Sequence, residues 1–280
     1  MNTLTSGLYI VSTPIGNLDD ITLRSLEVLK KSDIILCEDT RRSLKLLNHY
    51  KINKKLISYH KFNEKKELSK IIKYLKEGKI LSLISDAGTP ALSDPGQILI
   101  KNCIEENIKI IPIPGPSSIT AATSIAGFED KFLFYGFLPK TENELAKIMG
   151  GLKNLDFALV FFVPGIKINF YLKSFKKHLT GRDIFIAREI TKMHETFYRN
   201  TLTEIKLFKT PLKGELTVVI SKIYNNNQIE SNDDIINQAS EYLKKYSLKD
   251  VVELISKKEK VAKKKVYEIC LKIKNDKKNN

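Results

Sequence analysis

The stretch SDAGTPALSDPG, residues 85–96, separates two apolar runs, KILSLI at 79–84 and QILIKNCI at 97–104. It is short and polar, and its Gly and Pro residues are typical of turns. The run before it has the composition of a buried strand, and SDPG is typical of the start of a helix. A strand, a tight polar loop and a helix in this order indicate an α/β sheet, in which ligands bind beyond the carboxyl ends of the strands. The stretch therefore predicts a fold class and the place of a site.

The alternation of strands and helices extends along most of the chain and favours a largely parallel sheet in the first part. The strands predicted there are 8–13, 33–38, 55–59, 79–85 and 108–113, and the helices are 20–31 and 64–77. After a Pro-rich break at 112–118, further strands are predicted at 132–138, 157–163, 183–190, 195–201 and 215–221, with helices near 141–153 and 166–178. We expect more antiparallel pairing in this second part, because a short turn joins the two strands near 183–201.

Three structural parts follow from this pattern: an α/β domain at 1–114, a second α/β domain at 115–226, and a basic helical C-terminal module at 229–280. The polar segment YNNNQ at 224–228 is a predicted linker. Residues 233–275 are predicted to be helical with Lys-rich faces, which indicate either a solvated surface or a module that docks on RNA phosphates. Of these two interpretations we favour the RNA-binding one, because the whole chain is basic.

The composition is that of a globular protein, with 42% hydrophobic and 28% charged residues among 280. The net charge of +15 favours a polyanionic partner, nucleic acid first, although Lys is abundant throughout the chain. No apolar run reaches the roughly 18 residues of a membrane span, and no signal peptide is expected. The three Cys are far apart, so we expect no metal site and no disulfides, and we predict a cytoplasmic protein.

Six loops follow predicted strands and should gather at one edge of the fold. They are TPIGNLDD at 13–20, EDTRRS at 38–43, SDAGTPALSDPG at 85–96, PGPSS at 114–118, FFVPG at 161–165 and AREITKMHE at 187–195. Each alone is an ordinary turn, but together they indicate a cleft for a nucleotide-like ligand. Neither GxGxxG after the first strand nor GxxxxGK[ST] occurs, which disfavours dinucleotide and P-loop sites.

These motifs in this order resemble the ribosomal RNA small-subunit methyltransferase I family, 16S rRNA (cytidine-2′-O)-methyltransferases of the tetrapyrrole-methylase fold. The resemblance spans roughly residues 7–275, including the helical C-terminal segment. It implies two α/β domains with a cofactor cleft between them. It also implies S-adenosylmethionine as methyl donor, a homodimer, and the ribose of a decoding-region cytidine in small-subunit rRNA, or in the 30S subunit, as substrate.

The resemblance also implies which residues line the cofactor cleft. By position in the motifs, these are Pro14, Asp86, Gly88, Thr89, Ser117, Ser118, Phe162, Ala187, Gly214 and Glu215. One segment departs from the family pattern, which has an aromatic–Glu–Ser–Pro/Thr–His–Arg run where this chain has FFVPGIK. The Glu, His and Arg positions are Val163, Ile166 and Lys167.

Transfer of a methyl group to a 2′-hydroxyl requires in-line positioning and benefits from a general base. The candidate bases at the strand ends are Glu38, Asp39, Glu189 and Glu195, each of which could instead belong to an ion pair. The residues predicted to bind RNA phosphates are Arg41, Arg42, Arg188 and Lys192. His60 and Asn63 match a polar loop of the family, where we expect substrate contact or, for Asn63, a helix cap.

Two alternative functions stay open at this point. One is a tetrapyrrole (precorrin or uroporphyrinogen) C-methyltransferase, which predicts Gly-Asp in place of Ser85-Asp86 and gives no reason for a basic tail. The other is a non-catalytic RNA-binding relic of the same fold, supported by the altered run after Phe162. Within SDAGTPALSDPG, we expect Asp86 to face the cofactor and Asp94 to cap the next helix, with Pro95 at its first position.

Overall fold

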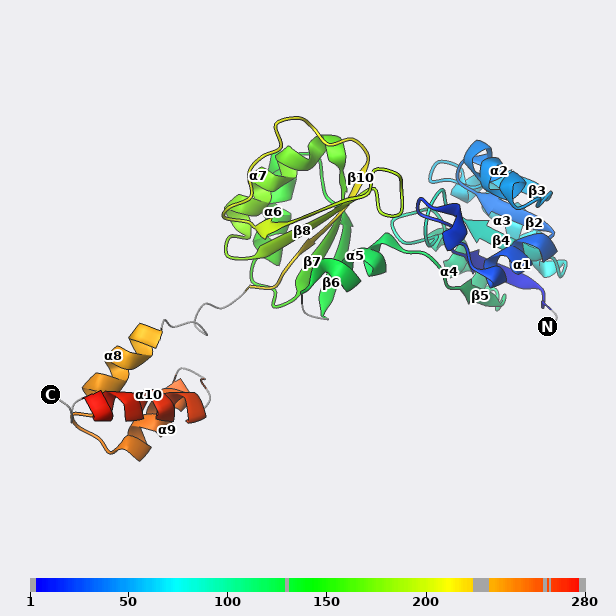
Figure 1. Ribbon diagram of the computed structural model, residues 1–280. Helices are drawn as coiled ribbons and strands as arrows, with labels where there is room; N and C mark the ends of the chain where they lie inside the picture. The colour runs from blue at the N-terminus through cyan, green and yellow to red at the C-terminus, as the bar shows by residue number, and fades with distance from the viewer. Residues whose placement is uncertain (1–3, 129–130, 224–231, 259–260, 262, 277–280) are drawn as a thin grey trace. The chain divides into compact units, whose positions relative to one another are not determined.

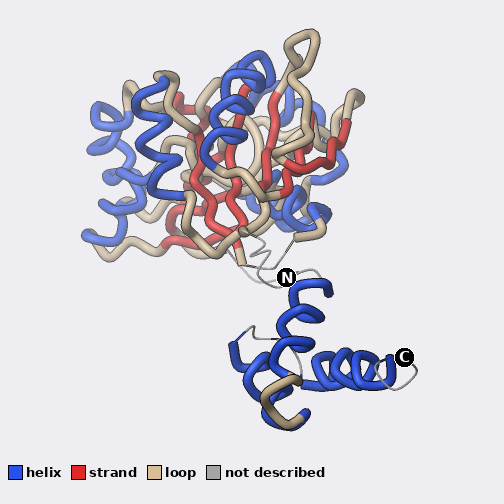
Figure 2. The backbone as a smooth tube through the Cα atoms, turned by 90° about the vertical axis from the view of Figure 1, so that its left-hand side faces the viewer, coloured by secondary structure: helices blue, strands red, loops and turns tan. Residues whose placement is uncertain are grey.

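The computed structural model describes residues 4–128, 131–223, 232–258, 261 and 263–276. The chain divides into two compact units, Met1–Lys222 and Ile223–Asn280. The first unit contains both sheets and the second contains only helices, as Figures 1 and 2 show. The predicted linker at 224–228 lies outside the described residues.

The first sheet is entirely parallel and contains the five strands that the sequence predicts. They are β1 (Gly7–Val11), β2 (Ile34–Cys37), β3 (Lys55–Ser58), β4 (Ile80–Ile84) and β5 (Ile110–Ile113), in the spatial order β3-β2-β4-β1-β5. The four residues of β2 are all buried, as expected for an inner strand covered by helices on both faces. Parallel pairing brings the carboxyl ends of all five strands to one edge.

Helices cover both faces of this sheet, because side chains along each strand alternate between two apolar layers. The connecting helices are α1 (Leu23–Lys31), α2 (Thr40–His49), α3 (Glu64–Lys76) and α4 (Gln97–Glu105), with a short 3-10 turn η1 (Leu18–Asp20) before α1. Leu29 of α1 and Leu47 of α2 pack with Val11 on one face. Ile71 of α3 and Leu99 of α4 pack with Leu8 on the other.

The second sheet is mixed, in the order β6-β7-β10-β8-β9. Its strands are β6 (Phe132–Phe137), β7 (Ala158–Pro164), β8 (Asp183–Arg188), β9 (Thr196–Thr201) and β10 (Glu215–Ile220). Only β6 and β7 pair in parallel, and the pairs β7–β10, β10–β8 and β8–β9 are antiparallel. The predicted antiparallel character of this part is therefore confirmed.

The two faces of the second sheet carry different helices (Figure 1). Helix α5 (Ser118–Ala126) packs on one face through Ile119 and Ala122. Helices α6 (Glu142–Leu152) and α7 (Ile168–His178) cover the other face, and a 3-10 turn η2 (Gly165–Lys167) precedes α7. Both sheets have helices on two faces, so the predicted α/β fold class is confirmed.

The C-terminal unit has a small apolar core of its own. It consists of α8 (Asn232–Tyr242), α9 (Leu248–Lys258) and α10 (Lys263–Asp276), which lie in the segment predicted to be helical. Ile235, Val251, Ile255 and Val266 are buried together between the three helices, and the Lys residues at the start of α10 are exposed. No helix in the described part of the chain is long and apolar enough to cross a membrane.

Candidate functional site

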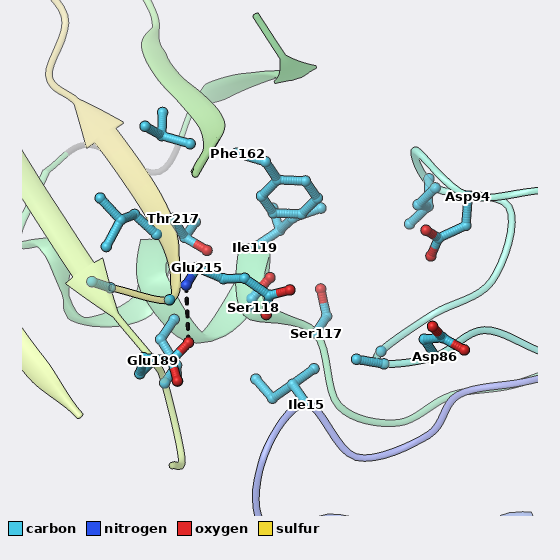
Figure 3. Close-up of a pocket in the computed structure, with 18 of the residues that line it drawn as sticks. Ile15, Asp86, Asp94, Ser117, Ser118, Ile119, Phe162, Glu189, Glu215 and Thr217 are labelled. Carbon is cyan, nitrogen blue, oxygen red and sulfur yellow. Dashed lines mark hydrogen bonds between the residues drawn. The ribbon is translucent and has the colours of Figure 1, made fainter. Parts of the chain in front are cut away.

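A pocket of about 440 Å³ lies where the strand ends of the two sheets meet. All six loops singled out in the sequence contribute residues to its lining, together with the start of β10. Its volume falls within the range of about 300–1,000 Å³ that is typical of small-molecule sites. Figure 3 shows Asp86 and Asp94 on one side of the pocket, with Glu189 and Glu215 opposite them.

The SDAGTP turn is tied to the neighbouring strand ends by backbone contacts. Gly88 exchanges two hydrogen bonds with Thr13: its carbonyl accepts from the Thr13 N–H at 2.9 Å, and its own N–H donates at 3.0 Å. Gly88 has φ +77°, a conformation that favours glycine, and a Cβ there would lie 3.3 Å from Ile15. The hydroxyl of Thr89 lies 2.9 Å from that of Ser12. The small residues of this turn therefore let backbone approach backbone at the edge of the pocket.

The first turn of α5 forms part of the floor of the pocket. Ser117 is the N-cap residue of this helix, but its side chain makes no capping hydrogen bond. Both Ser117 and Ser118 line the pocket (Figure 3). The N–H groups at the start of a helix have no partner within the helix and carry a partial positive charge. This corner can therefore bind a carboxylate.

The wall from the second domain combines apolar side chains with a charged network. Phe162 of β7 and Ala187 of β8 provide the apolar surface. Glu189 accepts hydrogen bonds from the Glu215 N–H at 2.9 Å and from Lys192 Nζ at 3.0 Å, and Lys192 also lies 3.0 Å from the Glu215 carboxylate. Burial alone would raise the pKa of Glu189, but the hydrogen bond from Glu215 and the pairing with Lys192 lower it overall. Glu189 is therefore a fixed anion rather than a proton acceptor.

A second group of carboxylates lies on the first-domain side. Asp86 pairs with Arg42 at 3.1 Å and accepts a hydrogen bond from the Asp39 N–H. Burial raises the pKa of Asp94 to about 6, and the charge of Glu38 adds to the shift. Burial, followed by the charge of Asp86, also raises the pKa of Glu38, against the opposing effects of Arg42 and His60. Asp94 therefore titrates closer to neutral pH than an ordinary Asp does.

The prediction that Asp94 caps α4 is wrong. The helix begins at Gln97, and its N-cap residue is Gly96, with φ +139°. A Cβ at Gly96 would lie 2.9 Å from Leu83 and 3.1 Å from Ala91, so only glycine lets the chain pass this close to β4. The helix therefore starts beyond Pro95, and Asp94 lines the pocket instead. The sequence signal that could have revealed this role was the presence of two Asp in one strand-end loop.

Most of the predicted site residues line this pocket. Those predicted for the cofactor and found in the lining are Asp86, Gly88, Thr89, Ser117, Ser118, Phe162, Ala187, Gly214 and Glu215. Pro14 is not part of the lining, but its neighbour Ile15 is. Of the predicted bases and RNA contacts, Glu38, Glu189, Arg42 and Lys192 line it as well.

The remaining predicted residues lie outside the pocket lining and are engaged locally. Asp39 is the N-cap residue of α2 and pairs with Arg41 at 2.8 Å, and the hydrogen bonds from Arg41 lower its pKa. Arg188 donates from Nε to the Lys213 carbonyl at 2.8 Å. The Glu195 carboxylate accepts a hydrogen bond from the Thr191 N–H.

The segment that departs from the family pattern forms an apolar part of the wall. Val163 and Pro164 line the pocket, and Val163 is buried. Ile166 is 72% exposed, so it points away from the core. The Gly165 N–H donates to the Gly214 carbonyl at 2.8 Å, which fixes the turn after β7 against the start of β10.

In the part of the chain that the structure describes, no three His, Cys, Asp or Glu side chains are grouped as metal ligands would be. The polar groups that line the pocket are carboxylates, hydroxyls and backbone groups, together with the cations of Arg42 and Lys192. They suit a ligand with both charged and apolar parts.

The fold and the pocket define a methylase of the two-domain α/β type. Residues 7–206 match the family model described as Tetrapyrrole (Corrin/Porphyrin) Methylases. The crystal structure of the methyltransferase CobJ superposes with a TM-score of 0.59 at 18% identity, covering 78% of this chain and 94% of that one, a likeness that shows the fold.

The sequence relatives identify the family more narrowly than the structural likeness does. Ribosomal RNA small subunit methyltransferase I of Thermotoga maritima is 45% identical over 218 residues, which are 76% of this chain and 97% of that protein. The protein of the same name from Rickettsia prowazekii is 42% identical over 273 residues, 95% of this chain and 96% of the relative. This chain therefore belongs to the ribosomal RNA small subunit methyltransferase I family of tetrapyrrole methylases, and the resemblance drawn from its motifs is confirmed.

Proposed function

We propose that this chain is an S-adenosylmethionine-dependent methyltransferase that modifies the ribose 2′-hydroxyl of a cytidine in the decoding region of small-subunit rRNA. The observation that carries the proposal is the pocket at the strand ends, in a chain whose relatives are named rRNA small subunit methyltransferases. The basic charge of the chain, +15, suits an RNA substrate.

The pocket suits S-adenosylmethionine in its chemistry. The start of α5, with Ser117 and Ser118, is positioned for the carboxylate of the methionyl part. The apolar wall formed by Phe162 and Ala187, beside Gly214, suits the adenosine part. Asp86 and the turn at Gly88 line the opposite side. When bound there, the cofactor supplies a methyl group on a cationic sulfur.

The residues of the chain supply orientation and a proton acceptor. Methylation of a hydroxyl releases one proton, and we assign Asp94 as its acceptor, because Asp94 lines the pocket and its pKa is raised to about 6. Burial, followed by the charge of Glu38, raises the proton affinity of Asp94. Arg42, paired with Asp86 at the pocket, is within reach of an RNA phosphate.

The site of action and the oligomeric state are further parts of the proposal. We place the enzyme in the cytoplasm, where rRNA is assembled into subunits, acting on rRNA or the 30S subunit. We propose a homodimer, which is supported by the partly exposed aromatic side chains of Phe132 and Tyr135 on the edge strand β6. Light scattering on the purified chain tests the dimer.

Calorimetry and methyl transfer together test the catalytic proposal. We expect S-adenosylmethionine to bind the purified chain and its labelled methyl group to be transferred to 16S rRNA or 30S subunits. A chain that binds no cofactor at millimolar concentration would favour an RNA-binding relic instead. Transfer to a tetrapyrrole but not to rRNA would favour the alternative methylase function.

A further inference from the structure

The loop that follows β3, residues 59–63, lies beside the proposed active site. Because β3 and β2 are parallel, its first residues continue along the end of β2, and the Tyr59 N–H donates to the Cys37 carbonyl at 2.8 Å. The residue that follows Cys37 is Glu38, which lines the pocket. The start of the loop is therefore hydrogen-bonded to the residue next to the pocket lining.

A buried carboxylate also joins this loop to the segment that carries Asp94. The Glu64 side chain is 8% exposed, and its Oε2 accepts from the Tyr59 hydroxyl and from the Gly96 N–H, each at 3.4 Å. The position of the loop is therefore fixed relative to the SDPG segment. The loop lies outside the pocket lining itself, and it is joined to two segments that contribute to that lining, the end of β2 and the SDPG segment.

The backbone of the loop is rigid because its own side chains hydrogen-bond to it. Asn63 accepts from the His60 N–H at 2.8 Å and donates to the Ser58 carbonyl at 2.9 Å, so its amide bridges the two ends of the loop. The Phe62 N–H donates to Nδ1 of His60 at 3.2 Å. Asn63 occupies the N-cap position of α3 but makes no side-chain capping bond, because its side chain is used within the loop.

This rigid loop presents an aromatic ring to solvent. Phe62 is 94% exposed, and its ring lies 6.1 Å from that of His60 in an edge-on arrangement. The face of the Phe62 ring is therefore free to stack against a planar group. Exposed cations flank it in the chain: Lys61 is adjacent to it, and Lys65 and Lys66 lie in the first turn of α3. An exposed ring among cations is the arrangement by which proteins hold unpaired bases and their phosphates.

We propose that Phe62 is a stacking platform for an unpaired base of the substrate RNA, one that flanks the nucleotide whose ribose enters the pocket. The inference rests on the proposed function. Phe62 would fix the register of the strand, and the neighbouring cations would contact the phosphates without regard to sequence. The prebuilt loop keeps the entropy cost of this contact low, because the ring is already positioned before RNA binds.

The absence of Trp from the chain allows a direct test. In Phe62→Trp, the single indole occupies the proposed stacking position, and a stacked base should quench its emission. The matched control is Ile104→Trp, because Ile104 is 64% exposed but lies near the end of α4, at the opposite edge of the sheet. A short single-stranded RNA is the probe, and heparin serves as a polyanion without bases.

We expect RNA, but not heparin, to quench Phe62→Trp, and neither to quench Ile104→Trp. We also expect Phe62→Ala to weaken RNA binding and raise the KM for rRNA by about 5- to 150-fold, the loss of one stacked base, with cofactor affinity unchanged. Phe62→Tyr should restore most of the affinity.

Two results would overturn the stacking role. The first is unchanged Phe62→Trp emission while anisotropy shows the RNA to be bound. The second is a Phe62→Ala defect on 30S subunits but not on naked rRNA, which would assign Phe62 to a protein contact. Methyl transfer by the wild-type chain is measured in parallel: its failure refutes the proposed function, whereas normal transfer by Phe62→Ala refutes only the stacking role.

Discussion

Asp94 shows how the surroundings of a side chain decide its role. Placed at a helix start, an Asp is an acceptor for backbone N–H groups and stabilises the fold. Here Gly96 takes the N-cap position, and the Asp94 carboxylate is left half-buried beside Glu38 with its pKa raised to about 6. Such a carboxylate destabilises the folded chain when it is charged, which is typical of residues kept for function.

The first prediction concerns Asp94→Asn. We expect kcat to fall by about 10²- to 10⁴-fold, because the proton acceptor is lost, with little change in cofactor affinity. In the wild type, kcat should decrease as the pH falls through about 6, where Asp94 becomes protonated. Because burial raises the folded-state pKa of Asp94, the charged carboxylate lowers the stability of the folded chain above pH 6. Asp94→Asn carries no charge at this position, so it should have a higher Tm than the wild type at pH 7.

This difference in Tm should vanish below the ordinary Asp pKa of 3.8, where Asp94 is neutral in both the folded and the unfolded state. The control is Asp39→Ala, which removes the N-cap acceptor of α2 and should lower Tm at pH 7 with kcat unchanged. A lower Tm and a normal kcat for Asp94→Asn would contradict the assignment.

The arginines show a second case in which side-chain type alone did not decide function. A guanidinium is a planar donor that serves several acceptors at once, inside a fold as well as at a site. Arg182 does so inside the fold, since it is fully buried and donates to the carbonyls of Lys153, Leu155 and Ser221. Arg199 donates to the Ile125 carbonyl, and Arg42 pairs with Asp86 in the pocket. Only the fold separates the structural arginines from those at the site.

Among the structural elements, the turns set the shape of the pocket more than the strands do. The turn before β10 brings Gly214, with φ +93°, so close to Glu189 that a Cβ would clash with its carboxyl group. Glu189 in turn accepts a hydrogen bond from the Glu215 N–H. A side chain at this turn would therefore displace the Glu189 carboxylate, which lines the pocket.

We therefore predict that Gly214→Ala lowers the affinity for the cofactor at least about tenfold, which corresponds to the loss of about one contact in the pocket. Calorimetry measures this affinity. The control is Gly78→Ala at the end of α3, which has a similar φ of +81° but nothing within 4 Å of the added Cβ. That variant should lose about 1 kcal/mol of stability from backbone strain and bind the cofactor normally. Equal cofactor affinities in the two variants would show that the turn does not shape the site.

The sequence predicted the elements better than it predicted their junctions. Apolar and alternating runs of residues identified strands such as β4 and β7, because a strand that is buried on both faces of its sheet has a recognisably apolar sequence. The start of α4 was misplaced, since the approach of Gly96 to Leu83 depends on tertiary packing. An ion pair of Glu189 was among the expectations, and Lys192 forms it. The pairing of Lys192 with Glu215 was missed, because these two residues are far apart in the chain.

At the scale of the whole molecule, the pocket and the basic C-terminal helices belong to different compact units. Every residue that lines the pocket belongs to Met1–Lys222. The C-terminal helices carry exposed Lys residues and their own apolar core. Their contribution is expected to be electrostatic and therefore sensitive to salt.

We predict that a chain ending at Lys222 binds S-adenosylmethionine as the full chain does but has a raised KM for rRNA. The KM of the full chain should also increase more steeply with salt than that of the shortened one, because fewer phosphate contacts remain after truncation. Steady-state kinetics at several salt concentrations measure both effects. Parallel salt slopes would mean that the helices do not contact RNA.

The position and chemistry of the methyl group test the central claim most directly. Small-subunit rRNA lacking the modification should be incubated with the wild-type chain and S-adenosylmethionine, then analysed by primer extension at limiting nucleotides and by nucleoside analysis. We predict a new stop at a decoding-region cytidine and the appearance of 2′-O-methylcytidine, both absent with Asp94→Asn. Methylation on a base, or no methylation of rRNA by a chain that binds the cofactor, would contradict the account.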